Sequence, residues 1–181
     1  MPSVLFVCLG NICRSPLVEG VYASHFAKSG LSASYFADSA ATSTYHVGEH
    51  PHSGGQRCAK GHGIDISKHR ARQVTAADFN RFDLIIGMDD SNMEDLRDMK
   101  KQLCPKGKAE LYMLSHFIPG QEGKEVPDAY YARDQAACFE EIYQMAQASI
   151  PALCEYLKKQ CCVCYITFAS SSKRSSGSFP G

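Results

Sequence analysis

The sequence contains no tryptophan, no excess of charge of either sign and no long run of apolar residues. Its 19 basic and 19 acidic residues cancel, and the basic ones do not form a single run, so nothing favours binding to nucleic acid or a membrane surface. No stretch approaches the roughly 20 apolar residues of a transmembrane helix. The N-terminus also lacks the segments of a secretory leader, and we expect a soluble, cytoplasmic protein.

Cysteine, by contrast, is abundant, with nine residues in 181. Nine is an odd number, and without a leader it favours reduced thiols over a secreted disulfide scaffold. A chain of this length can bury a core without a disulfide or metal staple. The cysteines match no metal-ligand spacing, so we expect neither metal nor cofactor. We predict one domain over residues 1–158 and a Cys-, Ser- and Gly-rich tail over residues 159–181.

One stretch near the N-terminus carries a specific chemical signal. The apolar residues 4–7 predict a buried strand, a glycine-containing turn follows, and Ser15 with Pro16 predicts a helix start with Ser15 as its N-cap. Cys8 therefore lies where the strand ends, and Arg14 where the helix begins. The N–H groups of such a turn and the positive end of the helix form an anion site, which would favour a thiolate nucleophile beneath it.

The spacing between these two residues fits a tetrahedral oxyanion. Cys8 and Arg14 are separated by five residues, enough for one loop around the anion, and a guanidinium can hold two of its oxygens. We therefore predict a phosphate-binding loop. Its members besides Cys8 and Arg14 are Leu9, Gly10, Asn11, Ile12, Cys13 and Ser15.

The rest of the chain alternates between strand and helix patterns. Strands are expected at residues 35–39, 83–88 and 109–114, and helices at 16–29, 56–62, 75–82, 91–103 and 135–158. This alternation predicts an α/β fold, a three-layer α/β/α sandwich with a four-stranded parallel sheet. Sites in such sheets lie beyond the carboxyl ends of the strands, where Cys8 is expected. The long loop over residues 116–134 is of a length that is usually functional or disordered.

The segment from Cys8 to Pro16 resembles the phosphate loop of the low-molecular-weight protein tyrosine phosphatases. Four later segments continue the resemblance in order, and it covers about residues 3–158: they are residues 38–43, 71–73, 88–92 and 128–131. The resemblance implies a phosphotyrosine phosphatase I-like fold. It implies hydrolysis of phosphotyrosine in proteins and of small aryl phosphates, including acid phosphatase activity, by a monomer or weak dimer. Cys8 would form a phosphocysteine intermediate, and Arg14 would bind the phosphoryl oxygens.

A proton donor is also required, because a phenolate leaving group has a pKa near 10. By resemblance the donor is Asp128, which would act as general acid and then as general base. The family carries a proline directly after this aspartate, whereas this sequence has Ala129. The missing proline would leave the backbone around Asp128 less constrained.

Other loop residues have supporting roles by the same resemblance. Asn11 tolerates a positive φ, and it would be tied to Ser39 and His69. Cys13 would form a reversible disulfide with Cys8 and protect it from irreversible oxidation.

Three tyrosines are expected to border the site. Tyr45, Tyr130 and Tyr131 fall in loops and could stack on a phenyl ring. Related phosphatases for arginine phosphate carry threonine at the position of Ile12, so Ile12 favours phosphotyrosine.

Alternatives remain open at this point. An arsenate reductase of the same fold would reuse Cys8 but needs a further cysteine pair near the third strand, which the sequence lacks there. A redox sensor or noncatalytic phosphoprotein-binding module would instead cycle Cys8 with Cys13. In the tail, the cysteines of residues 161–164 leave palmitoylation or metal binding open, and we expect disorder after about Ala169.

Overall fold

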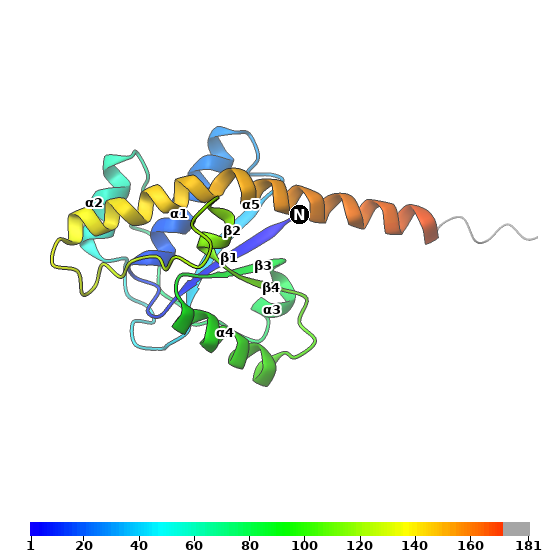
Figure 1. Ribbon diagram of the computed structural model, residues 1–181, viewed down its shortest axis with the longest axis horizontal. Coiled ribbons are helices and arrows are strands. Elements are labelled where there is room, and N and C mark those ends of the chain that lie inside the picture. The colour runs from blue at the N-terminus through cyan, green and yellow to red at the C-terminus, as the bar shows by residue number, and fades with distance from the viewer. Residues whose placement is uncertain (172–181) are drawn as a thin grey trace, which may run out of the picture.

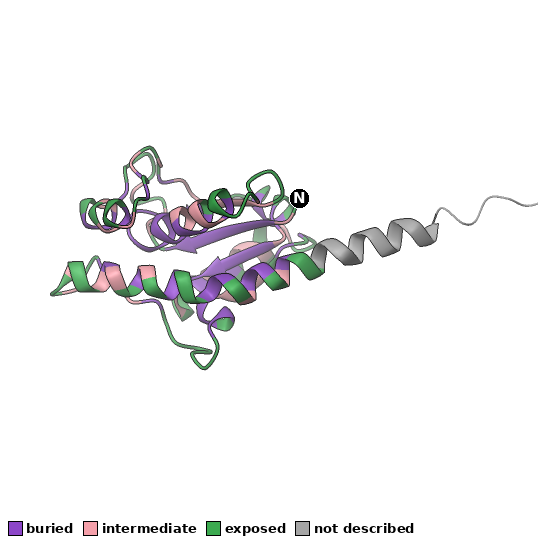
Figure 2. Ribbon diagram, turned by 90° about the horizontal axis from the view of Figure 1, so that it is seen from above, coloured by how far each residue is buried: buried purple, intermediate pink, exposed green. Residues whose placement is uncertain are grey.

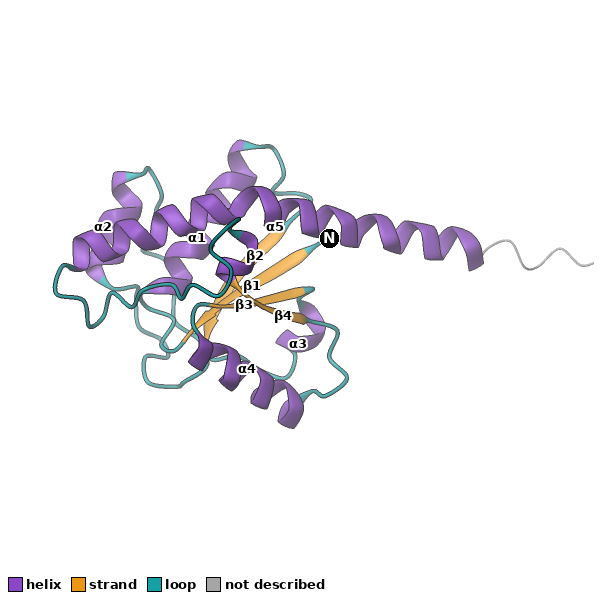
Figure 3. Cartoon of the chain, in the orientation of Figure 1, coloured by secondary structure: helices purple, strands orange, loops and turns teal. Residues whose placement is uncertain are grey.

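The fold is built on a four-stranded parallel sheet. The computed structural model describes residues 1–171, and the side chains of residues 1–159. The strand order is β2-β1-β3-β4, and the strands are drawn in orange in Figure 3. Their bounds are β1 Ser3–Cys8, β2 Phe36–Ala41, β3 Leu84–Gly87 and β4 Glu110–Met113. Strand β1 lies between β2 and β3, and all six of its residues are buried.

Helices cover both faces of this sheet, as Figure 1 shows. On one side lie α1 Arg14–Lys28, α2 Ser53–Gly61 and α5 Gln135–Ser171, and on the other α3 Asp78–Arg81 and α4 Asp90–Leu103. A 3-10 turn, η1 Leu114–Phe117, follows β4. Figure 2, seen from above, colours the strands β1 and β3 as buried. The predicted three-layer α/β/α sandwich is confirmed.

The two cores follow from the alternation of side chains along β1. Val4, Phe6 and Cys8 point into the core beneath α1 and α5, while Leu5 and Val7 point into the core beneath α3 and α4. One apolar face of each of the two long helices is buried. These faces comprise Val18, Val21, Tyr22 and Phe26 of α1, and Phe139, Ile142, Ala146, Ile150, Leu153 and Leu157 of α5.

The starts of α1 and α4 differ from the sequence prediction by one or two residues. Helix α1 begins at Arg14, with Cys13 as N-cap and no side-chain capping bond, so Ser15 is not the N-cap. Its hydroxyl lies 3.1 Å from the Cys8 sulfur instead. Helix α4 begins at Asp90, because the Asp89 carboxylate accepts a hydrogen bond from the Asn92 N–H at 2.6 Å. The Asp89 carboxylate, two residues after the end of β3, is therefore the N-cap of this helix.

Helix α2 begins at Ser53, three residues before its predicted start. The His52 ring nitrogen accepts a hydrogen bond from the Gly54 N–H at 3.1 Å and caps the helix. Gly54 is needed for close packing, since a Cβ there would lie 2.5 Å from the Phe139 ring. The backbone N–H of His52 also donates to the Ile12 carbonyl at 2.8 Å, and this bond connects α2 to the loop after β1.

Helix α5 is longer than predicted, since it continues past Lys158 to Ser171. The side chains of Cys161, Cys162 and Cys164 lie outside the described residues, as does most of the segment expected to be disordered after Ala169. Across the part of the chain that the structure describes, no helix is both long enough and apolar enough to cross a membrane.

The close approach of α2 to α5 gives a stability test. Gly54→Ala should lower the free energy of unfolding by about 1–3 kcal/mol, because the added methyl group overlaps the Phe139 ring. Gly61→Ala is the matched control: it lies in the same helix with nothing within 4 Å of an added Cβ, and should be neutral or stabilising by up to about 1 kcal/mol. Urea unfolding of the two variants measures the difference, and equal effects would contradict the packing role of Gly54.

Candidate active site

The candidate site lies where the strand order changes direction. From β1 the chain passes to β2 on one side of the sheet and then to β3 on the other, which opens a crevice at the strands' carboxyl ends. Cys8 ends β1, and Asp89 follows β3. A cavity of about 170 Å³ opens here. It is lined by Cys8, Leu9, Gly10, Ile12, Cys13, Arg14, Tyr45, His46, Asp128, Tyr130 and Tyr131.

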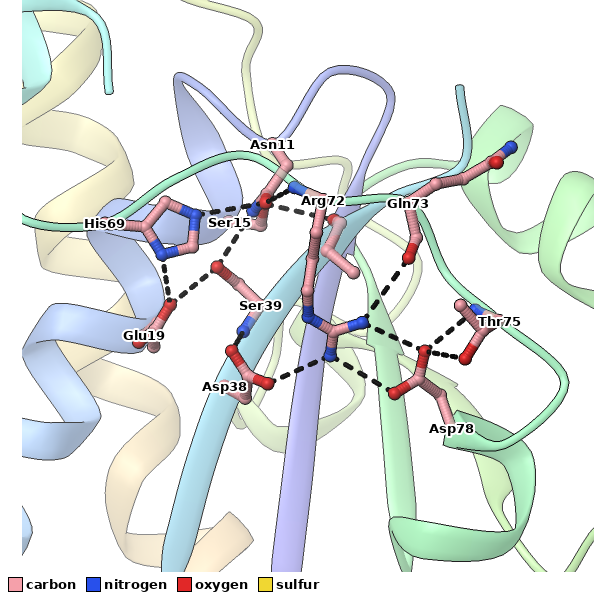
Figure 4. A network of polar contacts seen from close by, with 11 residues as sticks. Asn11, Ser15, Glu19, Asp38, Ser39, His69, Arg72, Gln73, Thr75 and Asp78 are labelled. Carbon is pink, nitrogen blue, oxygen red and sulfur yellow. Dashed lines mark hydrogen bonds and ion pairs between the residues drawn. The ribbon is translucent and has the colours of Figure 1, made fainter. Parts of the chain in front are cut away.

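The loop after β1 is fixed by the side chain of Asn11, whose backbone has a φ of 55°, a conformation that asparagine tolerates. Its amide nitrogen donates to the hydroxyls of Ser15 at 2.9 Å and Ser39 at 2.8 Å. Its amide oxygen accepts from the Arg72 N–H and from His69 Nε2, both at 3.0 Å (Figure 4). All four hydrogen-bonding positions of the amide are used. The structure thus brings Ser39 and His69 to Asn11, as the sequence predicts.

Further charged groups extend this network. Glu19 accepts a hydrogen bond from the Ser39 hydroxyl at 2.6 Å and lies 3.3 Å from His69 Nδ1. The Arg72 guanidinium binds Asp38 at 2.9 Å and Asp78 at 3.0 Å, as Figure 4 shows. Sequence reasoning gave Glu19 and Arg72 no role. Arg72 could have been found from the sequence, because it lies in the segment 71–73, one of the segments that carry the family resemblance.

The Cys8 sulfur lies beneath this loop and is almost fully buried. It accepts the Asn11 N–H at 3.3 Å, and the Ser15 hydroxyl oxygen is 3.1 Å away. The Ser15 hydroxyl accepts from the Asn11 amide, and it can donate its one proton to the Cys8 sulfur or to the Ala40 carbonyl, 3.4 Å away. The sulfur thus lies within hydrogen-bond distance of one backbone N–H and one hydroxyl group.

Arg14 is buried between two carboxylates. One guanidinium nitrogen lies 2.5 Å from Asp89, and the other lies 3.3 Å from Asp128. Burial alone would lower the pKa of Arg14, but the negative charges of Cys8, Asp128 and Asp89 outweigh it and raise this pKa above the ordinary value. Sequence reasoning did not assign Asp89 a role, although it lies in the segment 88–92 that carries the resemblance.

Asp128 approaches the loop from the long segment before α5. Its side chain is 33% exposed, and one carboxylate oxygen faces Arg14. The other accepts the Tyr130 N–H at 3.0 Å, in a turn closed by the aspartate itself. Ala129 is fully buried. The carboxyl group is therefore anchored at both oxygens in the absence of a following proline.

Aromatic side chains surround the mouth of the cavity. Tyr45, Tyr130 and Tyr131 are 76%, 47% and 80% exposed, and all three line the cavity as predicted. His46 also lines it, with its ring centre 6.1 Å from that of Tyr130, and sequence reasoning missed this residue. Such exposed rings can cover an aromatic ligand that enters the cavity.

Cys13 is buried in the cavity wall. Burial, together with the negative charges of Cys8 and Asp128, raises the pKa of the Cys13 thiol to about 12, so it is protonated at neutral pH. Cys8 and Cys13 are both free thiols in this structure. A disulfide between them stays a prediction.

Comparison with known proteins gives consistent matches. The family model described as low molecular weight phosphotyrosine protein phosphatase matches residues 3–163. A relative from Rattus norvegicus with that name is 44% identical over 153 residues, which span 84% of this chain and 94% of the relative.

Solved structures agree with this match. A protein tyrosine phosphatase from Entamoeba histolytica aligns with a TM-score of 0.79 and 31% identity, over 88% of this chain and 99% of the other. A drosophila arginine phosphatase aligns with a TM-score of 0.79 and 32% identity, over 86% of this chain and 97% of the other.

The role of Asn11 can be measured as stability. Asn11→Gly should lower the free energy of unfolding by about 2–4 kcal/mol, because buried groups lose their partners. Asn11→Ala should cost about 1 kcal/mol more, since alanine is strained at this φ. Asn80→Ala is the control: this exposed asparagine makes a single side-chain hydrogen bond, to Cys104 at 3.1 Å, and its loss should cost no more than about 1 kcal/mol. Chemical unfolding measures all three, and a glycine variant as stable as wild type would refute this role.

The buried Asp78 gives a pH test. Although burial raises its pKa, hydrogen bonds from Arg72 and Thr75 outweigh this and lower it below the ordinary value. The ionised group therefore stabilises the fold above the unfolded-state pKa of about 3.9, and this contribution disappears as the pH falls through the lower folded-state pKa. The stability difference between wild type and Asp78→Asn should be largest between about pH 5 and 7 and should shrink toward pH 3.

Urea unfolding across this pH range measures that difference. Glu94→Gln, which changes an exposed carboxylate on α4, controls for the general loss of one charge. A difference for Asp78→Asn that stays constant down to pH 3 would show that the ionised carboxylate has no stabilising role.

Proposed function

Since this chain belongs to the low molecular weight phosphotyrosine protein phosphatase family, we propose that it hydrolyses phosphotyrosine in proteins, and small aryl phosphates, through a phosphocysteine on Cys8. One observation carries the proposal. The Cys8 sulfur, the Arg14 guanidinium and the Asp128 carboxyl group line a single cavity of about 170 Å³. A nucleophile, an oxyanion clamp and a proton donor are the groups that this reaction needs.

In the first step, the Cys8 thiolate attacks phosphorus. An S–P bond forms, and the bond between phosphorus and the phenol oxygen breaks. Protonated Asp128 gives its proton to the departing oxygen, so that phenol rather than phenolate leaves. The hydrogen bonds from the Asn11 N–H and the Ser15 hydroxyl hold the sulfur beneath the loop for this attack.

In the second step, water hydrolyses the phosphocysteine. Asp128, now ionised, accepts a proton from the water as its oxygen bonds to phosphorus and the S–P bond breaks. Inorganic phosphate leaves and the Cys8 thiolate is restored. The 33% exposure of the Asp128 side chain gives water access to this carboxylate.

Arg14 would stabilise the charge on the transferring phosphoryl group. Its contact with Asp89 is short and mostly buried, so it fixes the guanidinium in place. Its contact with Asp128 is longer, at 3.3 Å, and lies on the open side. A phosphoryl oxygen can replace the second contact while the first remains, which directs the clamp at the reacting group.

The cavity mouth suits an aryl phosphate. Tyr45, Tyr130 and Tyr131 would cover the phenyl ring, and Ile12 would supply an apolar contact beneath it. One similar structure is that of an arginine phosphatase, and Ile12 is the residue that we propose directs this chain to phosphotyrosine. We also propose that the protein acts in the cytoplasm, as a monomer or weak dimer. The comparisons do not favour an arsenate reductase or a noncatalytic binding module.

Aryl phosphate turnover tests the mechanism. Cys8→Ser should abolish hydrolysis, because the serine hydroxyl remains un-ionised, and Asp128→Ala should lower kcat by about 10²–10⁴-fold. Across phenols of increasing acidity the loss for Asp128→Ala should shrink, because better leaving groups need less protonation. Cys104→Ser, outside the cavity, is the control. Steady-state kinetics on a phosphotyrosine peptide and a phosphoarginine peptide completes the set.

Three outcomes would contradict the proposal. Turnover by the Cys8→Ser variant would exclude a phosphocysteine intermediate. If Asp128→Ala lowered kcat by the same factor for all phenols, Asp128 would not be the general acid. Faster hydrolysis of the phosphoarginine peptide would assign the other substrate class.

A further inference from the structure

A second cluster of reactive side chains joins α2 to α5. Cys58 lies in α2, His62 directly follows that helix, and Glu140 lies in α5. His62 Nε2 is 2.9 Å from Glu140 Oε2, and the Cys58 thiol donates to the same oxygen at 3.8 Å. The three potential ligand atoms all lie within 4.8 Å of one another. None of the three residues lines the candidate active-site cavity.

Neighbouring residues orient each member of this cluster. Cys58 and His62 are four residues apart, so the end of the helix presents them on one face. The His62 ring stacks on Tyr143 with ring centres 3.6 Å apart and planes 7° apart. Gln144 donates to Glu140 Oε1 at 2.7 Å, which leaves Oε2 for the cluster. Outer contacts of this kind hold metal ligands in position.

We propose that Cys58, His62 and Glu140 bind one Zn²⁺ ion that links α2 to α5. Zn²⁺ accepts thiolate, imidazole and carboxylate ligands together, at about 2.0–2.3 Å from each. Tetrahedral ligands at those bond lengths lie roughly 3.3–3.8 Å apart, and the separations of 2.9 and 3.8 Å from Glu140 Oε2 bracket this range. Small side-chain rotations bring all three atoms to one ion.

Charge and space also fit this ion. The thiolate and the carboxylate together balance the two positive charges of Zn²⁺, and the imidazole remains neutral. On binding, the Cys58 thiol gives its proton to solvent as the S–Zn bond forms. A hollow of about 300 Å³ beside Cys58 and Glu140 leaves room for water as the fourth ligand.

The ion would act as a structural link. The His52 N–H, at the start of α2, donates to the Ile12 carbonyl in the loop after β1. An ion that fixes the other end of α2 to α5 would therefore reduce the motion of the helix that supports this loop. Because none of its ligands belongs to the hydrolytic site, the proposal stands independently of the proposed function.

Titration of the full-length reduced chain with Zn²⁺ alone and with Co²⁺ alone tests the site. Isothermal titration gives affinity and stoichiometry, and a thiolate-to-cobalt charge-transfer band reports the Co–S bond. Cys58→Ser, His62→Ala and Glu140→Gln are compared with the matched controls Cys104→Ser and Glu141→Gln. The same set is repeated with Cys161, Cys162 and Cys164 changed to serine, so that ions bound to those thiols are not counted.

We expect one ion per chain in wild type, both controls and the serine background, and an affinity at least about tenfold weaker in each of the three ligand variants. The charge-transfer band should be absent in Cys58→Ser. The ion should also raise the melting temperature of wild type but not of Glu140→Gln.

Two results would overturn the proposal. Equal uptake by wild type and Cys58→Ser would assign the ion to other thiols. No uptake in the serine background would show that the cluster joins the helices by hydrogen bonds only. Circular dichroism identifies any variant that fails to fold, and the pair Glu140→Gln and Glu141→Gln, which differ by one position on an accessible helix face, then decides the result.

Discussion

The left-handed backbone of Asn11 is the constraint on which the candidate active site depends. This conformation costs about 1–2 kcal/mol for a residue with a Cβ atom, and four hydrogen bonds from the Asn11 side chain offset that cost. Because the chain turns there, the Asn11 N–H faces the Cys8 sulfur and Arg14 begins α1 beside it. The groups that would bind phosphate are thus positioned by contacts on the far side of the loop.

The two carboxylates around Arg14 contact different guanidinium nitrogens and differ in exposure. Asp89 caps α4 and holds one guanidinium nitrogen, so the clamp is tied to the sheet through β3. Asp128 contacts the other nitrogen from a more exposed position and is the partner that a phosphoryl oxygen can displace. Cys13, whose raised pKa keeps it a thiol at neutral pH, lies in the wall of the same cavity. Asp89 therefore fixes the guanidinium in place, and the contact with the more exposed Asp128 leaves its other side accessible.

Local patterns were sufficient to predict the sheet, the long helices and the placement of Cys8 and Arg14, because these depend on residues close together in sequence. The helix starts were less predictable. Ser15 reads as a cap from its neighbours, but its hydroxyl is committed to Cys8 and Asn11, which no local pattern reveals. Gly54 suggests a turn, whereas it makes room for Phe139 from a distant helix. Asp89 escaped notice because its contact with Arg14 spans 75 residues.

The order of these elements along the chain also determines when the site can exist. Arg14 is 114 residues from Asp128, and α1 needs the apolar face of α5 to complete its core. A ribosome therefore releases Cys8 and Arg14 long before Asp128, and contacts between distant segments form slowly. A growing or truncated chain carries a thiol without its acid and without the helix that supports its loop. The complete arrangement of Cys8, Arg14 and Asp128 can therefore form only after the last third of the chain has been synthesised.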